Sequence, residues 1–189
     1  EAAVLTCTIG DGENVGRGEC VPYARYGETL ASVRGEIEAM RSDVEDGMDR
    51  AALNAAMKPG AARNALDCAL WDLEAKSGAG PVAGRIGVAP AKPLITAYTI
   101  SLGEPEQMGA AARENAHRPV LKVKVGTEDD VSRIAAVAEA APNARIILDA
   151  NEGWTEDNIR KHLLAAARYR VAVVEQPLPA GRDEILRNI

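Results

Sequence analysis

The stretch VLKVKVG, residues 120–126, places Lys122 and Lys124 in a segment whose other residues are almost all Val or Leu. Successive side chains of a β-strand point to opposite faces, so the two lysines share one face and the apolar residues share the other. The apolar face is suited to packing against helices. We therefore expect the two ammonium groups to point into a site and not into the core.

Strands and helices alternate on both sides of this stretch. Helix starts are indicated by Pro105, by Thr127 with Asp130 three residues later, and by Thr155. Alternation of this kind predicts a parallel β/α architecture, but by itself it does not choose between an open sheet and a closed barrel. The predicted strands are LITAYTIS (94–101), VLKVKV (120–125), ARIILDAN (144–151) and VAVVEQP (171–177).

Polar residues recur near the carboxyl ends of these strands. Thr99, Lys124, Asp149 and Glu175 follow one another at intervals of 25, 25 and 26 residues. Neighbouring strands lie about 4.8 Å apart, so we expect the Lys, the Asp and the Glu to stand side by side. Active sites of β/α barrels lie at this carboxyl face. The spacing therefore favours a TIM-like β/α barrel with its site at these strand ends.

The first half of the chain reads as α+β. AVLTCTIGDGENVGRGEC (3–20) predicts two strands around the turn signal Asp11-Gly12, and helical apolar spacing begins at Thr29. A second helix is predicted over ARNALDCALWDLEAKSG (62–78), with Trp71 in the core. After APAKP (89–93) the strand–helix alternation begins. We expect an α+β capping domain over residues 1–93 and the first four βα units of a barrel over residues 94–189.

Composition excludes several classes of partner. The formal net charge of −6 over 189 residues argues against nucleic acid, and no apolar run reaches the roughly 18 residues of a membrane span. Cys7, Cys20 and Cys68 form no zinc or disulfide pattern, which favours a reducing, cytoplasmic setting. His117 and His162 have charged neighbours and are expected to face solvent. A homo-oligomer is compatible with the sequence.

The residues at the strand ends suggest a metal-assisted proton transfer. Asp149 and Glu175 offer the hard oxygen ligands that Mg²⁺ prefers. Lys124 could remove a proton next to a substrate carboxylate if its pKa falls toward neutrality, and repulsion from Lys122 would favour that fall. The metal would then stabilise the resulting enediolate.

Each residue also has a structural interpretation. A lysine pair near a strand end can be a solvated edge feature, and Asp149 can cap the following turn. Asn151 can be a turn residue or a hydrogen-bond donor behind the metal ligands. Thr99 can be present only because threonine forms strands well.

Three motifs, KVKVG (122–126), LDANEGW (148–154) and VVEQPLP (173–179), resemble the enolase superfamily and its muconate-lactonizing-enzyme subgroup. PYARYGET (22–29), GAARNALDCALWDLEAK (60–76) and TAYTIS (96–101) resemble the dipeptide epimerases of the L-Ala-D/L-Glu type. The resemblance implies that Thr99 contacts the substrate, and we expect Lys122, on the same strand face as Lys124, to contact it as well. It also implies that Lys124 is one of two acid/base lysines and that Asp149 and Glu175 are two Mg²⁺ ligands.

The resemblance therefore implies an isomerase, a Mg²⁺-dependent epimerase that inverts the α-carbon of a dipeptide. Alternatives are o-succinylbenzoate synthase, muconate cycloisomerase or N-acylamino acid racemase activity, a catalytically silent metabolite-binding relative, or an unrelated barrel with a structural Mg²⁺. The family's third acidic ligand, opposing lysine and Asp-x-Asp motif are expected beyond Ile189. We accordingly expect the chain to be a segment of a longer enzyme.

Overall fold

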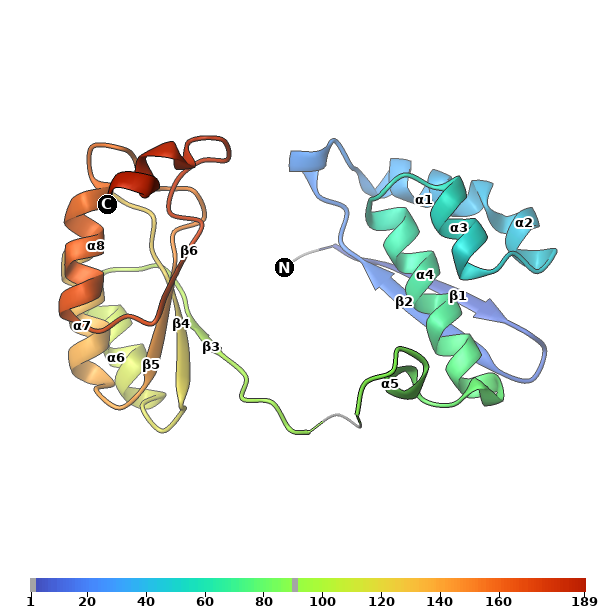
Figure 1. Cartoon of the computed structure of the whole chain (residues 1–189), viewed down its shortest axis with the longest axis horizontal. Helices are drawn as coiled ribbons and strands as arrows, with labels where there is room; N and C mark the ends of the chain where they lie inside the picture. Colours follow the sequence, from blue (N-terminus) through green and yellow to red (C-terminus); the bar gives the residue numbers. More distant parts are fainter. Residues whose placement is uncertain (1–2, 90–91) are drawn as a thin grey trace. The chain divides into compact units, whose positions relative to one another are not determined.

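The computed structural model describes residues 3–89 and 92–189, and the chain divides into two compact units between Lys92 and Pro93 (Figure 1). The predicted change to strand–helix alternation follows residues 89–93, of which positions 90 and 91 lie outside the described residues. Each unit is described by itself below.

The first unit combines a β-hairpin with a layer of helices. Strands β1 (Leu5–Gly10) and β2 (Val15–Cys20) pair antiparallel around the predicted turn. The longest helix, α4 (Ala61–Glu74), packs on the hairpin and continues into the π-helical turn η2 (Ala75–Ala79). The remaining elements are η1 (Ala24–Tyr26), α1 (Leu30–Ala39), α2 (Arg41–Glu45), α3 (Arg50–Ala56) and α5 (Val82–Arg85).

Two glycines of β2 allow the hairpin to approach α4 closely. Gly16 and Gly18 lie on the buried face of the strand. A Cβ atom would lie 2.1 Å from the carbonyl oxygen of Ala69 at Gly16, and 2.0 Å from that of Ala65 at Gly18. Only glycine fits at this distance, because a side chain would collide with the helix backbone. These glycines are therefore packing residues of the first unit.

The helical periodicity from Thr29 is confirmed, with one interruption. Thr29 caps α1 by accepting a hydrogen bond from the Ser32 amide, and the helix is interrupted at Met40 before α2 begins. Trp71 departs from the prediction, because it is half-buried and lies outside the buried cluster. The guanidinium of Arg50 stacks on its ring at 3.3 Å, so the indole packs under a cation and not in the apolar core.

The second unit is a four-stranded parallel sheet in the order β3-β4-β5-β6. Its helices α6, α7 and α8 lie along one face of the sheet (Figure 1). The strands are β3 (Tyr98–Ile100), β4 (Val120–Lys124), β5 (Arg145–Asp149) and β6 (Val173–Glu175). The helices are α6 (Pro105–Glu114), α7 (Asp130–Ala140), α8 (Ile159–Arg168) and η3 (Asp183–Asn188).

The predicted alternation along the central strands is confirmed. Leu121, Val123 and Leu148 are completely buried, whereas Lys122 and Lys124 on the opposite face are partly exposed. The first strand is shorter than predicted, since only Tyr98–Ile100 of residues 94–101 pairs with β4.

One of the three predicted helix starts is confirmed, because Pro105 occupies the first turn of α6. Thr155 exchanges hydrogen bonds with Asn158, but α8 begins only at Ile159. The start at Thr127 differs, because α7 begins at Asp130, and the Asp130 carboxylate accepts a hydrogen bond from the Thr127 amide. Within residues 3–89 and 92–189, no helix is long and apolar enough to cross a membrane.

Candidate active site

The strand register brings Lys124, Asp149 and Glu175 to one level of the sheet. Lys124 of β4 pairs with Asp149 of β5, and Asp149 pairs with Glu175 of β6. All three are the last residues of their strands. The side-by-side placement expected from the sequence is therefore confirmed, and the group lies at the carboxyl edge of the parallel sheet.

Thr99 lies farther from the carboxyl edge of the sheet than its equal spacing along the sequence predicted. It pairs with Lys122, two residues before Lys124, and it is exposed. Equal numbers of residues per βα unit do not guarantee equal heights, because a shorter strand can be offset by a longer loop. Thr99 and Lys122 are nevertheless neighbours in the register.

The two lysines share the buried carboxylate of Asp149. Lys122 Nζ lies 3.0 Å from Asp149 Oδ2 and 2.6 Å from Glu175 Oε2, and Lys124 Nζ lies 2.7 Å from Asp149 Oδ2. The Asp149 side chain is only 2% exposed, while those of Lys122 and Lys124 are 26% and 32% exposed. Asp149 is thus the buried centre of a charged group that opens toward solvent.

The ion pairs shift the pKa values of Lys122 and Asp149. Hydrogen bonds with Glu175 and Asp149 raise the pKa of Lys122. Burial acts to raise the pKa of Asp149, but the hydrogen bonds from Lys124 and Lys122 outweigh it and lower that pKa. The sequence predicted mutual repulsion as the main interaction of the lysines. In the structure each ammonium is paired with a carboxylate instead.

Asn151 occupies a turn, which is one of the two alternatives that the sequence left open. Its backbone adopts a left-handed conformation with φ 46°, and its backbone N–H donates a hydrogen bond to Asp149 Oδ1 at 3.1 Å. Its side-chain oxygen accepts a hydrogen bond from Lys124 Nζ at 2.8 Å. The side chain is thus an acceptor for Lys124, where a donor was expected. Asp149 likewise caps the turn with Oδ1 while Oδ2 binds the lysines.

The donor set is suitable for a hard divalent cation. One cation, the Lys122 ammonium, already lies between an oxygen of Asp149 and an oxygen of Glu175. Two carboxylates at adjacent strand ends match the oxygen ligands that Mg²⁺ takes, together with waters. In the part of the chain that the structure describes, no group of three or more His, Cys, Asp or Glu residues could hold a metal. Asp149 and Glu175 could therefore supply two ligands of such a shell, and the described residues alone do not complete it.

A buried polar cluster lies behind the loops that follow β4 and β5, and the sequence did not predict it. His162 is completely buried, so its predicted exposure is wrong, whereas His117 is exposed as predicted. His162 falls on the inner face of α8 with Ile159, and its ring centroid lies 4.7 Å from that of Trp154. Trp154 in turn donates to the buried Asp130. The Thr127–Asp130 spacing was the only signal of this cluster in the sequence.

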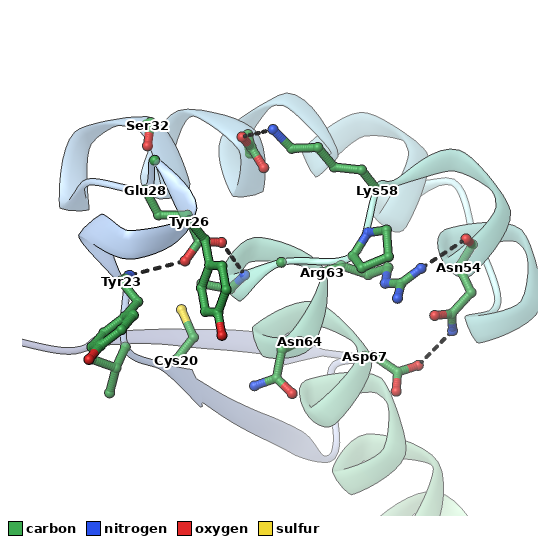
Figure 2. A pocket seen from close by; sticks show the side chains of 16 residues that line it. Cys20, Tyr23, Tyr26, Glu28, Ser32, Asn54, Lys58, Arg63, Asn64 and Asp67 are labelled. Atoms are coloured by element: carbon green, nitrogen blue, oxygen red, sulfur yellow. Dashed lines mark hydrogen bonds and ion pairs between the residues drawn. The ribbon is translucent and has the colours of Figure 1, made fainter. Parts of the chain in front are cut away.

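A pocket of about 910 Å³ lies within the first unit. Figure 2 shows Tyr23, Tyr26 and Glu28 at this pocket. The Glu28 carboxylate accepts hydrogen bonds from two backbone amides. The amides are those of Tyr23 and Ala61, and they lower the pKa of Glu28. Glu28 thereby joins residues 22–29 to the start of α4, two stretches that resemble dipeptide epimerases. Neither stretch contains a residue of the strand-end group.

A parallel β/α sheet with a Lys-Asp-Glu set at its strand ends, preceded by an α+β unit, defines a two-domain β/α-barrel class. The chain belongs to the mandelate racemase / muconate lactonizing enzyme family of the enolase superfamily. Residues 2–87 match the family's N-terminal domain, and residues 106–189 match the domain described as enolase C-terminal domain-like. The predicted family and barrel fold class are confirmed.

Two curated relatives align along almost all of the chain. The L-Ala-D/L-Glu epimerase of Escherichia coli K12 is 40% identical over 190 residues, which cover 100% of this chain and 59% of that protein. The N-acetyl-D-glutamate racemase of a Pseudoalteromonas species is 38% identical over 187 residues, covering 98% of this chain and 59% of that protein. The chain thus spans about 59% of the length of these relatives.

Solved structures share the same fold. An Agrobacterium tumefaciens enolase family member with homology to dipeptide epimerases, solved with sodium and L-Ala-L-Glu, is 56% identical, with a TM-score of 0.96. The match covers 100% of this chain and 58% of that chain. A Cytophaga hutchinsonii dipeptide epimerase complexed with Mg and D-Ala-L-Val is 27% identical, with a TM-score of 0.85, and the match covers 99% and 55%.

Proposed function

We propose that the protein containing this chain is a Mg²⁺-dependent epimerase of dipeptides, an isomerase that inverts an α-carbon next to a carboxylate. The observation that carries the proposal is that Lys124, Asp149 and Glu175 lie side by side at the carboxyl ends of adjacent strands. It is supported by the E. coli relative named for L-Ala-D/L-Glu and by the A. tumefaciens structure with L-Ala-L-Glu. Mg²⁺ is supported by the C. hutchinsonii complex.

In this proposal each strand-end residue has a defined part. Asp149 and Glu175 hold the metal, which when bound would withdraw electrons from the substrate carboxylate and acidify the α-proton. Lys124 takes or returns that proton at Nζ. Asn151 orients the Lys124 side chain, because it accepts a hydrogen bond from the same nitrogen. Lys122 and Thr99, neighbours in the register, contact the substrate.

A second candidate is racemisation of an N-acylated amino acid. It is favoured by the N-acetyl-D-glutamate racemase relative, whose 38% identity is close to the 40% of the E. coli epimerase. The proton transfer at Lys124 is the same in both reactions. The two differ in what is attached to the amino group, which is a second amino acid in one case and an acyl group in the other.

A substrate panel tests the proposed function and separates it from this alternative. The purified full-length protein with Mg²⁺ is incubated with L-Ala-L-Glu, L-Ala-D-Glu, hydrophobic dipeptides and N-acetyl-glutamate, and inversion is followed by polarimetry. We expect inversion of Ala-Glu dipeptides and its loss with EDTA. Activity confined to N-acetyl-glutamate would replace the epimerase by the racemase, and full turnover in EDTA would contradict the metal.

We further propose that the protein works in a reducing, cytoplasmic compartment. Cys7, Cys20 and Cys68 are free thiols in the structure. Burial raises the pKa of Cys7 and of Cys20, which keeps both thiols protonated and unreactive.

A further inference from the structure

The carboxylate of Asp130 lies at the centre of the buried cluster behind the strand-end group. Asp130 is the first residue of α7 and is completely buried. Its Oδ2 atom accepts three hydrogen bonds, from the Gly126 amide at 2.7 Å, the Thr127 amide at 2.8 Å and Trp154 Nε1 at 2.7 Å. One oxygen therefore joins the loop after β4, the loop after β5 and the start of α7.

The loops held by Asp130 are the continuations of the strands that carry the proposed acid/base group and a proposed metal ligand. Gly126 is two residues beyond Lys124, and Trp154 is three residues beyond Asn151. The two loops also touch through their backbones. A Cβ atom at Gly126 would lie 2.4 Å from the carbonyl oxygen of Ala150, and a Cβ atom at Gly153 would lie 2.4 Å from that of Gly126. No side chain fits between them at these points.

Asp130 is held as a carboxylate. Burial acts to raise its pKa, but the hydrogen bonds from Trp154, Gly126 and Thr127 outweigh burial and lower it. Arg133 approaches Asp130 Oδ1 to 3.6 Å and donates to Thr127 Oγ1. Hydrogen bonds to an ionised acceptor are stronger than those to a neutral one, so this oxygen holds its donors firmly.

We infer that Asp130 is a positioning residue for the proton transfer: through the Gly126 amide and the Trp154 indole, it fixes the backbone that follows Lys124 and Asn151. The inference rests on the proposed function of Lys124. Asp130 does not touch the reacting atoms, and it acts only through the loops. Its effect falls on the chemical step, because a displacement of about 1 Å in a reacting group can slow that step about 100-fold.

Steady-state kinetics of four variants of the full-length protein test this role. Asp130→Ala removes the acceptor, Asp130→Asn restores one oxygen, and Trp154→Phe removes only the indole donor. Val137→Ala is the matched control, because Val137 is a completely buried residue of the same helix, α7, and its aliphatic side chain has no hydrogen-bond donor or acceptor. Amide hydrogen exchange is also measured for the wild type and each variant, in the peptides that cover residues 125–128 and 150–155.

We expect Asp130→Ala to lower kcat by about 10- to 100-fold while KM stays within about twofold, since the lost geometry matters in the transition state. Asp130→Asn should regain most of the lost kcat, and Trp154→Phe should lie between wild type and Asp130→Ala. Val137→Ala should lower the unfolding temperature without lowering kcat. The Gly126 and Thr127 amides should exchange faster in Asp130→Ala alone.

Two results would overturn the inference. The first is a kcat within twofold of wild type in Trp154→Phe and in whichever Asp130 variants fold. The second is an equal loss of kcat in Val137→Ala, because that would make the effect one of general stability. A wild-type protein without epimerase or racemase activity would overturn the proposed function itself, and the role of Asp130 with it. An active wild type with unaffected variants would overturn the Asp130 role alone.

Discussion

At the scale of single residues, two buried aspartates organise the second unit. Asp149 uses one oxygen to cap the turn at Asn151 and the other to bind both lysines. Asp130 uses one oxygen to bind two backbone amides and an indole. Both carboxylates are buried but paired, which is how proteins accommodate charge away from water. Asp149 serves the proposed chemistry directly, and Asp130 serves the backbone behind it.

The lowered pKa of Asp130 makes a prediction about stability in acid. A carboxyl whose pKa is lower in the folded than in the unfolded state stabilises the fold above its unfolded pKa of about 3.9. That contribution is lost as the pH falls through the folded pKa. We expect Asp130→Asn to lower the free energy of unfolding by about 1–3 kcal/mol at pH 7, and the gap to wild type to narrow below about pH 4.

Urea unfolding of the full-length protein at a series of pH values, without added metal, measures this gap. A difference between Asp130→Asn and wild type that stays constant down to pH 2 would show that Asp130 has the same pKa in both states.

At the scale of elements, the sequence predicts periodic features well and contact geometry poorly. The alternation in residues 120–126 and the polar residues at strand ends could be read directly, because both depend on local periodicity. The height of Thr99, the burial of His162 and the cationic stacking on Trp71 could not, since each depends on contacts with another element of the fold. The sequence indicated Asp130 only through its position three residues after Thr127, at a predicted helix start.

Close packing between β2 and α4 gives an element-scale prediction. In Gly18→Ala the new Cβ would meet the Ala65 carbonyl oxygen at 2.0 Å, so the strand or the helix must shift. We expect a loss of about 1–3 kcal/mol in the free energy of unfolding. Gly35→Ala is the control, because Gly35 is an exposed residue of α1 with open space around it, and it should gain about 0.5–1 kcal/mol. Equal stability of both variants in urea unfolding would contradict the close approach.

At the scale of the whole molecule, the chain holds one proposed acid/base lysine and two proposed metal ligands, and it spans about 59% of its curated relatives. Inversion of an α-carbon by two bases requires a group on each side, since one removes the proton and the other returns one to the opposite face. The proposed inversion therefore requires a second base that acts together with Lys124.

Hydrogen exchange at the α-carbon in D₂O tests whether Lys124 is one of the two bases. The full-length wild type and Lys124→Ala are each incubated with one pure epimer of the dipeptide, and the α-hydrogen is followed by NMR. We expect the wild type to exchange and invert both epimers, whereas Lys124→Ala should invert neither and should exchange only the epimer whose α-hydrogen faces the opposing base. Exchange of both epimers by Lys124→Ala would show that Lys124 is not a base.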